Sequence, residues 1–204
     1  MKIAYKHLLR FLIDKPSIED LSTKLFQLGH EHEIEGSIFD MEFTPNRGDC
    51  LSLLGLARDL NVFYETNLDV LIYEDELAKL DLNFFNKTID ECPEISFLNI
   101  QINDQVSEYK DYLNDYFIDL NINKNNFFTD VSNYVAYEMG QPTHSYDFSL
   151  IEDDITLQEF TSTSSFKTLL GNNIELEGSN LVFTSKGKII NLSGVVGGIE
   201  TACS

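Results

Sequence analysis

The C-terminal part of the sequence limits the possible folds most strongly. From residue 151 onward, short apolar runs alternate with turn-forming residues, at 155–160, 166–170, 173–176, 181–184 and 188–193. Turn signals at 171–173 and 185–187, each containing a glycine, separate some of these runs. Short runs with this spacing predict strands that pair through tight turns. A sheet is therefore expected to dominate this part of the chain.

The N-terminal part follows a helical pattern instead. Residues 17–28 carry a stripe of leucines, Ser17 can cap the first turn, and Gly29 can end the helix in the left-handed conformation. A short strand is expected around 38–43. These signals predict a small domain of helices and short strands.

The segment TPNRGDC, residues 44–50, predicts a tight turn. Pro45 disfavours helical geometry at the residue before it, and Gly48 can adopt a positive φ. Asp49 is expected to cap a helix that runs to about Tyr64. Arg47 is expected to act as a structural clamp in this turn, and an RNA contact is the alternative.

The middle of the chain divides these two patterns. Residues 65–91 are acidic and irregular, with a possible short helix near 74–80. The alternating segment 95–102 predicts a strand, and the aromatic stripe at 109–120 predicts a helix capped by Ser107 and packed on a sheet. The expected fold class is α+β. The chain is expected to consist of a small N-terminal helix and strand domain (1–70), an acidic linker (71–91) and a mixed, sheet-rich domain (92–204).

Charge and composition exclude several classes of protein. The chain has 14 basic and 34 acidic residues and a net charge of −20, so it repels a polyanion at long range. Any RNA contact has to be local or helped by a basic partner. There is no apolar run of 18 residues, no signal peptide at the N-terminus, and only three widely spaced cysteines. The sequence therefore predicts a cytoplasmic protein without a membrane span, a disulfide framework or a zinc cluster.

Two places in the sequence are candidates for chemistry. His144 lies in a loop fixed by Pro142, where an imidazole can act as a donor or base near neutral pH. Gly194, Gly197 and Gly198 follow a strand, and main chain without side chains can approach a ligand and hold an oxyanion. A plain turn or bulge remains the alternative for these glycines, and a structural role remains the alternative for His144.

The other histidines are expected to be structural. His30 and His32 lie two residues apart just after a helix end, which predicts a solvated polar turn rather than a metal site. His7 is expected to be a partly buried helical residue.

Three long segments resemble one family. DMEFTPNRGDCLSLLGLARDL, TDVSNYVAYEMGQPTHSYD and LLGNNIELEGSNLVFTSKGKIINLSGVVGGIE are similar, in the same order, to motifs of bacterial phenylalanyl-tRNA synthetase beta subunits. The resemblance covers most of the chain and matches the N-terminal part of that subunit.

The resemblance implies a role in tRNA charging. The family forms a heterotetramer of two alpha and two beta subunits, which joins phenylalanine to tRNA(Phe) with ATP and Mg²⁺. The aminoacylation site lies in the alpha subunit, and an editing domain of the beta subunit hydrolyses mischarged tyrosyl-tRNA. His144 matches the editing-site histidine, Asn133 matches an asparagine of the pocket, and Gly194, Gly197 and Gly198 match its glycine wall. No cofactor or metal is expected in this segment.

Departures from the family pattern qualify these expectations. The usual OB-fold insertion before TPNRGDC is missing, and Glu94 and Ile95 replace a basic and an aromatic residue of the family. The editing domain is expected to be truncated after the glycine wall, so the isolated chain is expected to lack aminoacylation activity and a complete editing site. A free-standing hydrolase of mischarged tRNA and a noncatalytic binding module are the alternatives.

Overall fold

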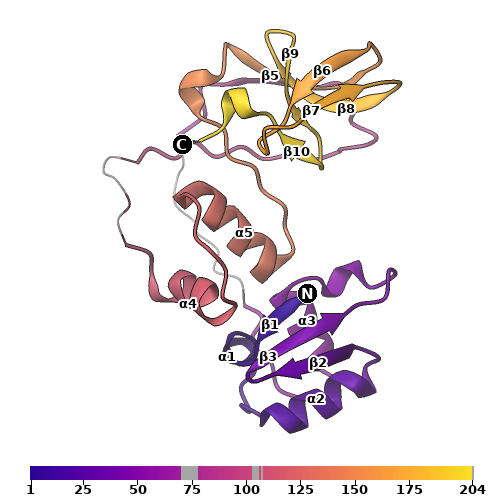
Figure 1. The fold of residues 1–204 in the computed structure, drawn as a ribbon, viewed down its shortest axis with the longest axis vertical. Helices are drawn as coiled ribbons and strands as arrows, with labels where there is room; N and C mark the ends of the chain where they lie inside the picture. Colours follow the sequence, from indigo (N-terminus) through magenta and orange to yellow (C-terminus); the bar gives the residue numbers. More distant parts are fainter. Residues whose placement is uncertain (70–77, 103–105, 107, 204) are drawn as a thin grey trace. The chain divides into compact units, whose positions relative to one another are not determined.

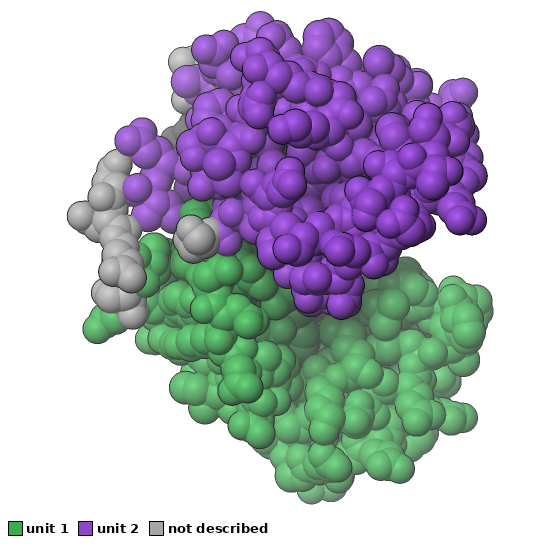
Figure 2. Space-filling model, turned by 45° about the horizontal axis from the view of Figure 1, so that its top comes forward, with its two compact units in different colours: residues 1–74, 106–143 green, residues 75–105, 144–204 purple. Residues whose placement is uncertain are grey.

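The computed structural model describes residues 1–69, 78–102, 106 and 108–203 (Figure 1). The chain forms two compact units (Figure 2). Unit 1 contains residues 1–74 and 106–143, and unit 2 contains residues 75–105 and 144–204. Residues 106–143 therefore belong to the same compact unit as the N-terminal part. The domains expected from the sequence follow chain order instead, and their boundaries stay a prediction. None of the described helices is long and apolar enough to cross a membrane.

Unit 1 combines a three-stranded antiparallel sheet with α-helices and 3₁₀ turns. The strands are β1 (Lys2–Ala4), β2 (Glu31–Glu35) and β3 (Ile38–Glu42), in the order β1-β3-β2. The α-helices are α1 (Tyr5–Leu8), α2 (Ile18–Gln27), α3 (Leu53–Leu60), α4 (Asp111–Asp119) and α5 (Phe127–Met139), and the 3₁₀ turns are η1 (Leu9–Phe11) and η2 (Gly48–Cys50). One hydrophobic core joins these elements, with Phe39, Leu56 and Tyr116 among its members.

The first predicted helix and strand are confirmed as α2 and β3. The Ser17 side chain accepts a hydrogen bond from the Asp20 N–H, and Gly29 has a φ of +83°. His7 is helical, as expected, and more deeply buried, with 3% of its surface exposed.

The TPNRGDC turn differs from the prediction at its end. Gly48 does not have a positive φ, and the cap of α3 is Ser52, whose side chain accepts from the Gly55 N–H. The Asp49 carboxylate is instead bound by Arg47 and Arg58. The prediction that Asp49 caps a helix to Tyr64 is therefore wrong, because its carboxylate has stronger, charged partners.

The prediction of a strand at 95–102 is wrong. These residues are all described and form no strand, and Leu98 and Ile100 are 66% and 60% exposed. Ile95 and Phe97, on the other side of the alternation, pack against the core of unit 2. The aromatic stripe does form a helix, α4, but its N-cap is Lys110 and it packs with α5 in the core of unit 1 rather than on a sheet. Ser107 and most of the possible helix at 74–80 lie outside the described residues.

Unit 2 is built on a five-stranded sheet. Its strands are β4 (Asn83–Asn86), β5 (Asp154–Phe160), β8 (Asn180–Ser185), β9 (Lys188–Leu192) and β10 (Val196–Gly197), in the order β10-β9-β8-β5-β4. All its pairs are antiparallel except β4 with β5. A separate hairpin joins β6 (Ser164–Lys167) to β7 (Asn173–Leu176), and η3 (Phe148–Leu150) and η4 (Ile199–Thr201) are short 3₁₀ turns.

The five runs predicted from residue 151 onward correspond to β5 through β9. The predicted turns are present, because Gly171 and Gly187 have φ values of +80° and +77°. The α+β fold class is therefore confirmed. The sequence did not indicate β4, which lies in the segment predicted to be an irregular linker.

Candidate functional site

His144 begins the C-terminal segment of unit 2. The helix α5 ends at Gly140, which has a φ of +73°, and the residues from there to His144 form a loop that contains Pro142. The chain just after His144 is fixed within unit 2, because Tyr146 forms an antiparallel bridge with Ala202 and the Asp147 N–H donates to the Thr201 carbonyl over 3.0 Å. The main chain that carries the imidazole is thus anchored beside η4.

The imidazole of His144 packs directly on the main chain of Gly197. A Cβ atom added to Gly197 would lie 2.1 Å from Cε1 and 2.6 Å from Nε2 of His144, and 2.9 Å from Cδ1 of Leu169. Only a glycine therefore leaves room for the ring in this position. The structure brings these two predicted site residues together, in contact rather than on opposite sides of a cleft.

The neighbouring glycines have different places. Gly194 has a φ of +71° between β9 and β10. The Gly198 N–H donates to the Ile190 carbonyl over 2.8 Å, so it is already used within the sheet. Gly197 and Asn191 are directly opposite each other in the β9–β10 ladder. Because the neighbouring residues Gly198 and Ile190 are hydrogen-bonded, Gly197 and Asn191 form a non-hydrogen-bonded pair. The N–H of Gly197 therefore points away from β9.

Burial sets the protonation of the ring. Although His144 as a whole residue is exposed, its ring packs on Gly197 and lies 4.5 Å from the Tyr146 ring in an edge-on arrangement of 70°. Removal of the ring from water lowers the pKa of His144. The imidazole is therefore neutral near pH 7 and able to accept a proton.

Asn133 lies on α5, with an exposed side chain, and belongs to unit 1. Its place in the site remains a prediction. Sequence reasoning missed Tyr146, Asn191 and Leu169 as neighbours of the site. Of these three residues, Tyr146 alone is close to His144 in the sequence, two positions after it, and that spacing could have indicated that the two side chains are neighbours.

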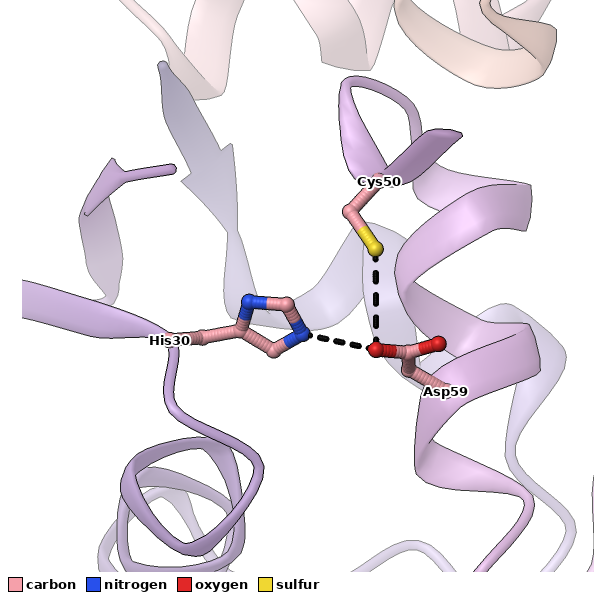
Figure 3. Close-up of side chains that lie close together, drawn as sticks. All are labelled: His30, Cys50 and Asp59. Atoms are coloured by element: carbon pink, nitrogen blue, oxygen red, sulfur yellow. Dashed lines mark hydrogen bonds and ion pairs between the residues drawn. The ribbon is translucent and has the colours of Figure 1, made fainter. Parts of the chain in front are cut away.

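A second group of side chains corrects the expectation for His30 and His32. Both are buried, with 2% and 8% exposed, so the predicted solvated turn is wrong. His30 Nε2 lies 2.9 Å from Asp59 Oδ2, and Cys50 Sγ lies 3.6 Å from the same oxygen (Figure 3). His32 stacks on Phe26 at 4.3 Å.

His30, Cys50 and Asp59 are residue types that can bind a metal ion, but a cation of the chain already contacts two of them. Nη2 of Arg47 donates to Sγ of Cys50 over 2.8 Å and also to the Asp59 carboxylate. Burial raises the pKa of the Cys50 thiol to about 12, so the sulfur stays protonated near neutral pH. We interpret the group as a structural clamp centred on Arg47.

Comparison with known proteins decides the family. The model of the B3/4 domain matches residues 91–204. The chain belongs to the B3/4 domain family. Its relatives include the phenylalanine–tRNA ligase beta subunits of Fusobacterium nucleatum, 30% identical over 172 residues, and of Psychrobacter arcticus, 27% identical over 173 residues. These alignments cover 80% and 81% of this chain and 21% of each relative, so the chain spans about a fifth of their length.

A further relative agrees with this family. The beta subunit of Rhodopirellula baltica is 27% identical over 98% of this chain and 31% of its own length. Among solved structures, an N-terminal fragment of the phenylalanyl-tRNA synthetase beta subunit from Pyrococcus horikoshii matches with a TM-score of 0.48 and 13% identity, covering 100% of this chain and 64% of that one. The resemblance predicted from the three sequence segments is confirmed: this chain is homologous to part of these beta subunits.

Proposed function

We propose that this B3/4 chain works as part of a phenylalanine–tRNA ligase beta subunit and forms part of a site that hydrolyses mischarged tyrosyl-tRNA. The observation that carries the proposal is the contact of a neutral imidazole, His144, with the bare main chain of Gly197. In the complete ligase, alpha subunits would charge tRNA(Phe) with ATP and Mg²⁺, in the cytoplasm. The 204-residue chain alone would not aminoacylate.

The chemistry of the two amino acids explains why such a site is needed. Tyrosine differs from phenylalanine by one hydroxyl group, and an apolar pocket discriminates against an added hydroxyl by only about a hundredfold. A second site that accepts the tyrosyl ester and hydrolyses it removes the error.

The proposed reaction is hydrolysis of the ester that joins tyrosine to the tRNA ribose. The oxygen of a water molecule attacks the ester carbonyl carbon while His144 accepts a proton from that water. The carbon–oxygen bond to the ribose then breaks, and His144 returns the proton to the ribose oxygen. The N–H of Gly197 is the main-chain donor proposed for the tetrahedral oxyanion, since the N–H of Gly198 is bound to Ile190. Gly194 and Gly198 are proposed to contact the substrate, and Asn133 is proposed as a further substrate-binding residue.

The test compares the wild type with His144→Ala, in this chain alone and within a complete beta subunit assembled with its alpha partner. We expect the substitution to slow deacylation of tyrosyl-tRNA in the assembled ligase about 100-fold or more, as for loss of a general base. Charging with phenylalanine on the same samples is the control and should not change. Equal deacylation by the two forms would remove His144 from the mechanism.

The isolated chain distinguishes the alternatives. Hydrolysis of tyrosyl-tRNA by the 204 residues alone would indicate a free-standing hydrolase. Binding of tRNA without hydrolysis, in the chain and in the assembled ligase, would indicate a noncatalytic module.

A further inference from the structure

Two polar side chains next to His144 have no part in the proposed hydrolysis. Tyr146 follows it by two residues, and Asn191 lies on β9. Asn191 is only 6% exposed. A buried side-chain amide needs a hydrogen-bond partner, so Asn191 is expected to have one near the site.

The ring of Tyr146 supports one side of the imidazole. The two ring centroids are 4.5 Å apart, at an angle of 70°. The bridge from Tyr146 to Ala202 fixes the main chain under this ring. His144 thus packs against the Tyr146 ring on one side and Gly197 on another.

Asn191 lies on the same face of the sheet as the site. It is directly opposite Gly197 in the β9–β10 ladder, and residues directly opposite each other share a face. The missing Cβ of Gly197 points to His144, so the Asn191 side chain is directed to that face as well. Burial raises the pKa of the Tyr146 hydroxyl, and the Asn191 side chain lowers it, which is the effect expected when an amide N–H points at that oxygen.

We propose that Tyr146 and Asn191 are positioning residues, in which the Asn191 amide holds the Tyr146 hydroxyl and the Tyr146 ring holds the His144 imidazole against Gly197. The inferred bond between Asn191 and Tyr146 would close a path of observed neighbours, which runs from Tyr146 through His144 to Gly197, the residue that faces Asn191 across the ladder. Without the aromatic support the imidazole could turn into solvent, because His144 is otherwise exposed. The catalytic consequence rests on the proposed function, whereas the positioning itself does not.

The first experiment measures the position of the ring in the 204-residue chain. The Cε1–H resonance of His144 is followed by NMR during a pH titration in the wild type, Tyr146→Leu, Tyr146→Phe and Asn191→Ala. In Tyr146→Leu we expect the ring-current shift to disappear and the pKa to rise toward about 6.5, the value of a solvated histidine. Tyr146→Phe and Asn191→Ala should each cause a smaller change in the same direction, and the double variant should equal either single variant.

Tyr112→Phe is the matched control, since Tyr112 lies on α4 in unit 1 and is 45% exposed. It should leave the His144 resonance unchanged. The inference is overturned if a folded Tyr146→Leu retains the wild-type resonance and pKa. If that variant does not fold, additive effects of Tyr146→Phe and Asn191→Ala, or no effect of either, overturn it as well.

The second experiment measures deacylation of tyrosyl-tRNA by the assembled ligase. For Asn191→Ala we expect kcat to fall about tenfold with KM unchanged, because a misplaced group slows the reaction without weakening binding. An unchanged kcat would contradict the catalytic part of the inference. If His144→Ala itself has no effect on deacylation while the NMR changes occur, the proposed function fails and the positioning stands. Absence of the NMR changes refutes the positioning, whatever the enzyme does.

Discussion

Alanine substitution at Gly198 should destabilise unit 2 through a clash with the main chain. A Cβ atom there would lie 2.8 Å from the Ile190 carbonyl oxygen and 3.1 Å from Cε2 of Phe166. The φ and ψ of Gly198, −84° and 149°, are open to alanine, so the cost comes from these contacts and not from backbone strain. The carbonyl cannot move freely, because it accepts the Gly198 N–H within the sheet.

The magnitude follows from two opposing effects. Overpacking costs about 1–3 kcal/mol. Alanine also stabilises the folded state by about 0.4–1 kcal/mol, because it lowers the conformational entropy of the unfolded chain relative to glycine. The net loss of about 1–2 kcal/mol lowers Tm by roughly 2–8 °C in a chain of this length. Thermal unfolding followed by circular dichroism measures this shift.

Gly197→Ala is the matched control at the adjacent residue. Its added Cβ would meet the end of the His144 side chain, which can move, rather than main chain. We therefore expect a stability change within about 1 kcal/mol, accompanied by displacement of the His144 NMR resonance. Equal Tm values for the wild type and Gly198→Ala, or an equally large decrease for both variants, would refute the reasoning.

Two further predictions concern unit 1. Arg47→Ala should lower Tm, because it removes the charged partner of the Asp59 carboxylate and leaves it with His30 and the Cys50 thiol. An unchanged Tm with weaker tRNA binding would favour the RNA-contact alternative for Arg47. Burial lowers the pKa of His7, so the unfolded chain binds a proton at higher pH than the folded one, and stability should decrease as the pH falls below about 6.5. Denaturant unfolding between pH 7.5 and 5 should show a flatter dependence in His7→Gln, and an unchanged slope would contradict this assignment.

Local signals were sufficient for much of the fold. The helix α2 was predictable because its cap at Ser17 and its end at Gly29 lie within the segment itself. The strand predicted at 95–102 was wrong because alternation indicates a buried face but supplies no partner strand. In the structure β4 lies beside β5 instead.

Contacts between distant residues account for the remaining errors. His30 is buried because Asp59, 29 positions further along the chain, accepts its hydrogen bond, and nothing near His30 in the sequence indicates this. The site shows the same limit. The glycine run predicted a close approach to main chain, but only the register of β9 with β10 shows that Gly197 meets His144 while Gly198 faces Phe166.

The parallel pairing of β4 with β5 has a practical consequence for dissecting this protein. The strand Asn83–Asn86 covers the outer edge of β5, yet it precedes residue 91, where the match to the B3/4 domain begins. A fragment trimmed to that boundary would leave the hydrogen-bonding groups along β5 open. Exposed strand edges pair with other chains. Expression of this region as a monomer therefore requires a start upstream of residue 83.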